Sequence, residues 1–161
     1  MFALRQIFFY SLLCILAACQ QLPQDDAPLY SDVDTIKFTK GETVFPFSYI
    51  DPTEKGWKVV IEISGDDLND LSPRIRSRKL ATTKPNVLKM VRNWKFTYSG
   101  GDLATVTSTI LVYKDGTLVD QQGIVLDKKL VGLQSIKFGW IDPQEPEQVF
   151  KAISLMDQKN F

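Results

Sequence analysis

The stretch TVTSTILVYKDGTLVDQQGIVL, residues 105–126, decides the fold class that the sequence predicts. Two runs rich in β-branched residues, 105–114 and 117–126, flank the pair Asp115-Gly116. An Asp-Gly pair in this setting is a strong signal for a β-hairpin with a two-residue turn, because both residues tolerate the positive φ that such a turn requires. The turn would pair Val112 with Val119, Ile110 with Gln121, and Val106 with Val125.

Alternating apolar and polar side chains mark further strands outside this hairpin. The cleanest alternation covers residues 57–63 and predicts a half-buried antiparallel strand. Shorter alternations at 36–38, 45–49 and 136–140 predict three more strands. Residues 65–86 have no sustained period, so we interpret them as a long loop.

Two segments bear on the helix content. Residues 87–98 fit both an alternating pattern and a helical face that follows Pro85, and the aromatic content favours a strand over 90–98. The segment beginning at Pro146 predicts a C-terminal helix, because Pro suits the first helical position and apolar residues then recur on one face.

Together these elements predict a mainly β domain of about six to eight strands. We expect an antiparallel β-sandwich or a strongly curved sheet with one C-terminal α-helix. An α+β sheet-and-helix arrangement is the alternative, and helical structure at 85–94 would favour it. The domain would span residues 33–161.

An apolar leader ends in Leu16-Ala17-Ala18-Cys19. The run of twelve residues at 7–18 would make a helix of about 18 Å, which is too short for a bilayer core of about 30 Å. Its length and the small residues at its end are typical of a secretory signal peptide. A plain secretory signal and an uncleaved anchor are the alternatives.

The leader resembles the lipobox segment of bacterial lipoprotein precursors. The resemblance implies that residues 1–18 are removed and that Cys19 becomes the acylated first residue, which would anchor the protein in a membrane. Gln20 in place of Asp implies an outer-membrane location facing the periplasm. Residues 19–32 would then form the lipidated Cys and a flexible tether.

Residue content limits the chemistry that this domain can perform. The chain has no His, and its two Cys lie in the leader and at the predicted acylation position. Ser-His-Asp hydrolysis, thiol nucleophiles and His- or Cys-ligated metals are therefore excluded. The sequence also contains no SxxK, GxGxxG, Walker or HExxH motif, so we predict neither catalytic residues nor a cofactor.

Positive charge is concentrated in residues 71–101, which contain eight Lys and Arg and no acidic residue. In an extended segment Arg74, Arg76 and Arg78 would all point the same way. With Lys79 and Trp94 they form our predicted partner surface, suited to an acidic envelope protein or an anionic envelope polymer. We expect no nucleic acid in that compartment. The alternative is a solvated loop paired with the acidic residues at 66–70.

Two other clusters carry weaker signals. The residues Asp66, Asp67, Asn69 and Asp70 resemble part of a calcium loop, but Leu71 stands at the fifth position of that loop, where a ligand is required, so we predict no metal site. Most aromatic residues have the spacing of a sheet core rather than of a glycan platform, with Trp94 as the expected exception.

The sequence therefore favours a non-enzymatic binding or assembly module on a membrane-anchored envelope lipoprotein. One alternative is a lipoprotein inhibitor or immunity protein that acts against an enzyme or toxin. The other is a hydrolase that uses two carboxylates, although the sequence does not identify such a pair.

Overall fold

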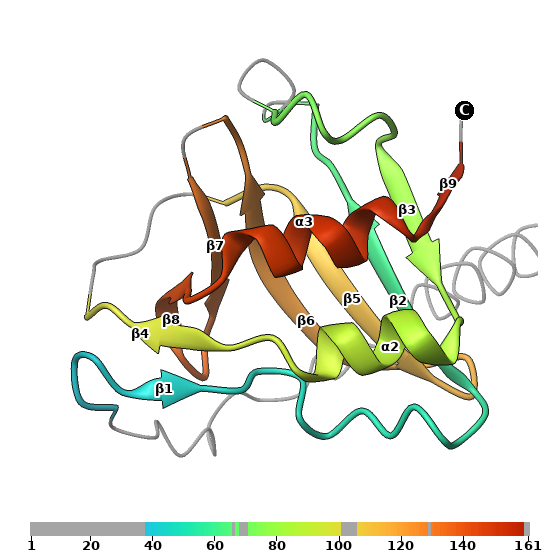
Figure 1. The fold of residues 1–161 in the computed structure, drawn as a ribbon, viewed down its shortest axis with the longest axis horizontal. Coiled ribbons are helices and arrows are strands. Elements are labelled where there is room, and N and C mark those ends of the chain that lie inside the picture. The colour runs from blue at the N-terminus through green and yellow to red at the C-terminus, as the bar shows by residue number, and fades with distance from the viewer. Residues whose placement is uncertain (1–37, 66, 68–70, 101–105, 129, 160–161) are drawn as a thin grey trace, which may run out of the picture. The chain divides into compact units, whose positions relative to one another are not determined.

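Nine antiparallel strands form one sheet in the described part of the computed structural model, and two helices lie across it (Figure 1). The structure describes residues 38–65, 67, 71–100, 106–128 and 130–159. The sheet order is β1-β4-β8-β7-β6-β5-β2-β3-β9. The strands are β1 Thr43–Val44, β2 Trp57–Glu62, β3 Lys79–Thr82, β4 Phe96–Tyr98, β5 Thr109–Lys114, β6 Thr117–Leu126, β7 Val131–Ser135, β8 Gly139–Pro143 and β9 Asp157–Lys159.

The hairpin of β5 and β6 lies inside this sheet and turns at Asp115-Gly116, as predicted. Asp115 has a φ of 51° and Gly116 a φ of 84°, the positive values that a two-residue turn requires. The predicted register is wrong beyond the turn, because a β-bulge follows the pair of Tyr113 with Leu118. The bulge moves the observed pairs by one residue: Val112 with Asp120 and Ile110 with Gln122, while Val106 precedes β5.

Both helices cover the same face of the sheet in Figure 1. The helix α3, Pro146–Ser154, buries Val149, Ala152 and Ile153. The helix α2, Pro85–Arg92, buries Val87, Leu88 and Val91. These side chains join one core with the inward residues of the central strands, and a fully buried aliphatic side chain contributes about 1.5–3 kcal/mol. The inward strand residues include Val59, Ile61, Ile110, Val112, Ile124 and Leu133.

The mainly β class with a C-terminal helix is confirmed, and the sheet also carries a second helix. The strand predicted over 90–98 is wrong in its first half, because residues 85–92 are helical and β4 begins only at Phe96. Pro85 at the helix start and the apolar face that docks on the sheet outweigh the aromatic content of this segment. The helix on which the α+β alternative depended is therefore present, but the sheet dominates the fold.

Three shorter predictions are also corrected. Residues 45–49 form turns rather than a strand, with Ile50 N–H donating to the Phe47 carbonyl at 3.1 Å. Residues 136–138 form the turn between β7 and β8. The loop predicted over 65–86 contains β3, whose short buried run Leu80–Thr82 has no alternation that reveals it.

Several predictions concern residues that lie outside the described ranges. These are the leader with Leu16, Ala17, Ala18 and Cys19, the tether at 19–32, and the acidic residues Asp66, Asn69 and Asp70. No helix in the described part of the chain is both long and apolar enough to span a membrane.

Candidate functional site

The basic segment Arg74–Lys79 leads into β3 and alternates as the sequence predicts. Ile75 and Ser77 are buried, whereas Arg74, Arg76 and Arg78 are exposed. Ile75 N–H donates to the Ser72 carbonyl at 2.9 Å, and the Ser77 hydroxyl donates to the Lys79 carbonyl at 3.0 Å. The buried side chains thus hold the backbone so that the three guanidinium groups face solvent.

Two of these cations are already paired within the domain. Arg74 Nη1 lies 2.8 Å from Glu147 Oε2 on α3, and its guanidinium carbon lies 4.8 Å from the ring centroid of Phe150. Lys79 donates to Glu62 on the neighbouring strand, and this hydrogen bond and the carboxylate charge raise the pKa of Lys79 above its ordinary value. Both partners differ from the acidic residues at 66–70 that the sequence suggested.

Arg76 and Arg78 differ from their neighbours, because neither has a carboxylate partner among the described residues. Arg78 lines a hollow of about 470 Å³ together with Glu62, Ile63 and Lys79. The lining contains the Lys79–Glu62 ion pair and the Arg78 guanidinium, so these residues carry a net positive charge. Arg76 and Arg78 are thus the two cations of the predicted surface for which the described residues supply no carboxylate.

Trp94 does not belong to that surface. Its side chain is 3% exposed and packs edge-on against Phe47 and Phe96, with ring centroids 5.7 and 6.5 Å away. The prediction that Trp94 contacts a partner is therefore corrected, since the residue belongs to the core. Its position at the end of α2, a helix that the sequence interpretation assigned to a strand, explains the error.

Asp67 forms a hydrogen bond that joins two segments of the domain. Its carboxylate accepts a hydrogen bond from the Ser108 hydroxyl, whose oxygen accepts one from Ser64 N–H at 3.0 Å. These bonds tie the segment after β2 to the segment before β5. The described residues contain no group of three or more potential metal ligands.

A second cleft was not predicted from the sequence. It has a volume of about 690 Å³ and lies where β2 begins, between the preceding loop and the start of α2. Apolar and aromatic side chains supply part of its lining, and Lys55 and Lys58 add positive charge. The lining residues are Pro52, Thr53, Glu54, Lys55, Gly56, Trp57, Lys58, Thr83, Pro85, Leu88, Tyr113 and Gly116.

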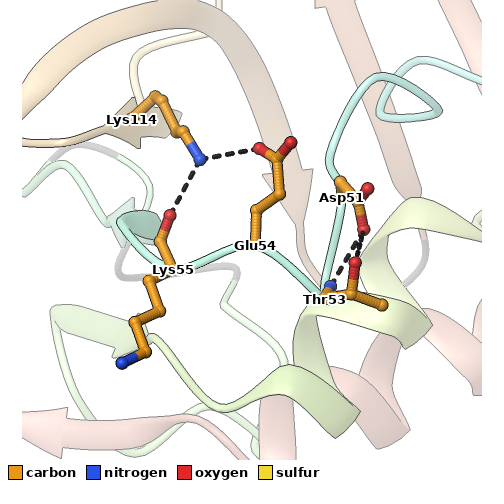
Figure 2. A network of polar contacts seen from close by, with 5 residues as sticks. All are labelled: Asp51, Thr53, Glu54, Lys55 and Lys114. Atoms are coloured by element: carbon orange, nitrogen blue, oxygen red, sulfur yellow. Dashed lines mark hydrogen bonds and ion pairs between the residues drawn. The ribbon is translucent and has the colours of Figure 1, made fainter.

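A polar network holds the loop of this cleft in place (Figure 2). Lys114 on β5 donates to Glu54 Oε2 and to the Lys55 carbonyl, both at 2.8 Å. Asp51 Oδ1 accepts from the Thr53 hydroxyl at 2.7 Å and from its N–H at 2.9 Å, and these bonds hold the pKa of Asp51 below its ordinary value. Figure 2 shows the Lys55 side chain directed away from this network.

Aromatic packing braces the other side of the same loop. Tyr49 lies with its ring centroid 6.0 Å from that of Trp57, and Lys114 Nζ lies 5.0 Å from the Trp57 ring. The Tyr49 hydroxyl donates to Asp120 Oδ2 at 2.6 Å. Burial first, and then the bond to Asp120 and its charge, raise the pKa of Tyr49 well above its usual range.

Three glutamates of the described structure are paired with cations. Glu54 and Glu62, which line the two hollows described above, and Glu147 on α3 each accept from a Lys or Arg of the same domain. Comparison of the chain with protein-family models, curated proteins and solved structures finds no match.

Proposed function

We propose that this protein is a lipid-anchored envelope lipoprotein whose domain is a non-enzymatic binding or assembly module. Its partner is an envelope protein or polymer with negative charge. The proposal is carried by Arg76 and Arg78, which are exposed and have no carboxylate partner among the described residues. Two guanidinium groups on a braced backbone offer fork-shaped donors that suit carboxylate or phosphate groups.

The anchor rests on the leader sequence. Acyl chains on Cys19 would hold the protein at the membrane, and the tether that follows would let the domain reach a partner in the envelope. Cys19→Ala in the full chain should leave an uncleaved precursor without acyl label. Labelling of cells with a tagged fatty acid, followed by mass analysis of the N-terminus, measures this. Normal cleavage and labelling of the variant would refute the lipoprotein assignment.

The binding proposal has a matched charge-reversal test. Arg76→Glu with Arg78→Glu changes the proposed surface, while Lys40→Glu with Lys95→Glu makes the same charge change at exposed positions elsewhere. Crosslinking in intact envelopes, followed by affinity capture of the full chain, should show about a tenfold loss of the crosslinked partner for the Arg variant alone. Equal capture by the two double variants would contradict the proposal, and circular dichroism checks that both remain folded.

A further inference from the structure

A step in the sheet creates the large cleft at the start of β2. On one side of β2, Trp57 and Lys58 pair with Lys114 and Tyr113 of β5. On the other side β3 ends at Thr82, opposite Val59, and the chain turns into α2. Among the described residues, the first two residues of β2 therefore have a strand neighbour on one side only.

The main chain of Trp57 faces this step. The Gly56 carbonyl accepts from Asp115 N–H on the β5 side, and Ile63 N–H donates to the Arg78 carbonyl on the β3 side. Hydrogen-bonding direction alternates along an antiparallel strand, so Trp57 points to the same side as Ile63. The backbone N–H and C=O of Trp57 form a short open strand edge, the kind of edge to which an extended peptide adds.

The side chains at this edge favour a ligand with a carboxylate. Neither Lys55 nor Lys58 has a carboxylate partner among the described residues, whereas the charge of Glu54 is offset by Lys114. The Trp57 side chain itself lines the cleft beside these two Lys residues.

We propose that the cleft binds an extended acidic peptide segment by strand addition at Trp57. The peptide main chain pairs with the open edge of β2, and a peptide carboxylate lies against Lys55 and Lys58. Apolar side chains of the peptide lie against Leu88 and Pro85, which line the cleft. Arg76 and Arg78 lie beyond the other end of β2, so this site is independent of the function proposed above.

The indole signal of Trp57 reports on this site directly. The chain has three Trp, so the ¹⁵N-labelled full-length protein in detergent micelles gives three indole signals, and Trp57→Phe identifies one of them. The probe is an eight-residue peptide of alternating Val and Asp. Its controls are the matched peptide of Val and Lys and free acetate. We expect saturable movement of the Trp57 signal with the acidic peptide only, while the signal of buried Trp94 stays in place.

Variants separate the charge requirement from a general surface effect. Lys58→Glu should weaken binding of the acidic peptide by about tenfold, the result of losing one exposed ion pair and adding a repulsion of similar size. Lys58→Arg and Lys95→Glu should bind as the unchanged protein does. The proposal is overturned if the Trp57 signal does not move or if the Val and Lys peptide moves it equally. It is also overturned if acetate alone moves the signal as far, because the cleft would then bind a free carboxylate and not a peptide strand.

Discussion

The two ends of β2 carry positive charge in different ways. At its far end the cations come from one short segment, Arg74–Lys79, and two of them are neutralised by Glu147 and Glu62. At its start Lys55 and Lys58 meet Trp57, Leu88 and Pro85, which come from separate parts of the chain. A run of charge in the sequence thus overstates the free charge on the surface, and the cleft formed by long-range packing gives the more enclosed site.

Substitutions of Trp94 and Trp57 test this contrast, and they should give the largest difference in the free energy of unfolding. Trp94→Ala should lower the free energy of unfolding by about 3–5 kcal/mol, because it empties a fully packed position between Phe47 and Phe96. Trp57→Ala should cost clearly less, since its side chain is only partly buried. Urea denaturation of both variants measures the difference. Equal losses would show that the cleft is as tightly packed as the core.

Two glycines flank β2 and provide the next comparison. Gly56, before the strand, has a φ of 89°, and an added Cβ would lie 1.9 Å from Asp115 Oδ1. Gly56→Ala should therefore destabilise the domain by about 1–2 kcal/mol through backbone strain. Gly65, after the strand, has no atom of the described residues within 4 Å of an added Cβ, so Gly65→Ala should be neutral or slightly stabilising. Thermal unfolding of the two variants checks the prediction, and a neutral Gly56→Ala would contradict it.

Substitutions of Arg74 and Arg76 should differ by less in their effect on the free energy of unfolding. Arg74→Ala removes an exposed ion pair and a cation–π contact, which together contribute about 1 kcal/mol. Arg76→Ala should change stability by less than about 0.5 kcal/mol, because it removes no such contact in the described structure. Denaturation at low and high salt measures both, and the Arg74 effect should shrink as salt rises. A larger loss for Arg76→Ala would reveal a partner for that side chain.

The smallest predicted effect is an opposite pH dependence of the stability contributed by Asp51 and by Lys79, which lie near opposite ends of β2. The pKa of Asp51 is lowered in the folded state, so its contribution is present above the unfolded pKa and is lost as pH falls through the folded value. The pKa of Lys79 is raised, so its contribution is present below the unfolded pKa and is lost as pH rises through the folded value. NMR titration should show both shifts. Thr53→Ala should return the Asp51 pKa toward its ordinary value, and an unchanged value would exclude Thr53 as the cause.

Local patterns predicted the parts of the fold that depend on neighbouring residues. The turn at Asp115-Gly116, the strand at 57–62, the helix from Pro146 and the outward alternation of Arg74, Arg76 and Arg78 all follow from short-range chemistry. These features need no knowledge of distant segments.

Long-range packing accounts for what the sequence did not reveal. Residues 85–92 are helical because their apolar face meets a sheet that is assembled from other segments. The cleft depends on where β3 ends against β2, and the pairing of Arg74 depends on α3 lying across the sheet. Lys58 and Tyr113, which both line the cleft, are paired across β2 and β5. This pairing could be predicted only if the register between the two strands were known.

The bulge between β5 and β6 adds one residue to the β6 side of this hairpin. With the extra residue, Asp120 pairs with Val112, and the inward positions of β6 then include Gln122 and Ile124. With this turn and no bulge, Val112 would pair with Val119, and Ile124 would face out of the core. Deletion of the exposed Val119 would remove the bulge and keep Ile124 in the core, because Leu118 would then be followed directly by Asp120. The bulge thus joins a two-residue turn to an apolar strand face that is out of phase with it by one residue.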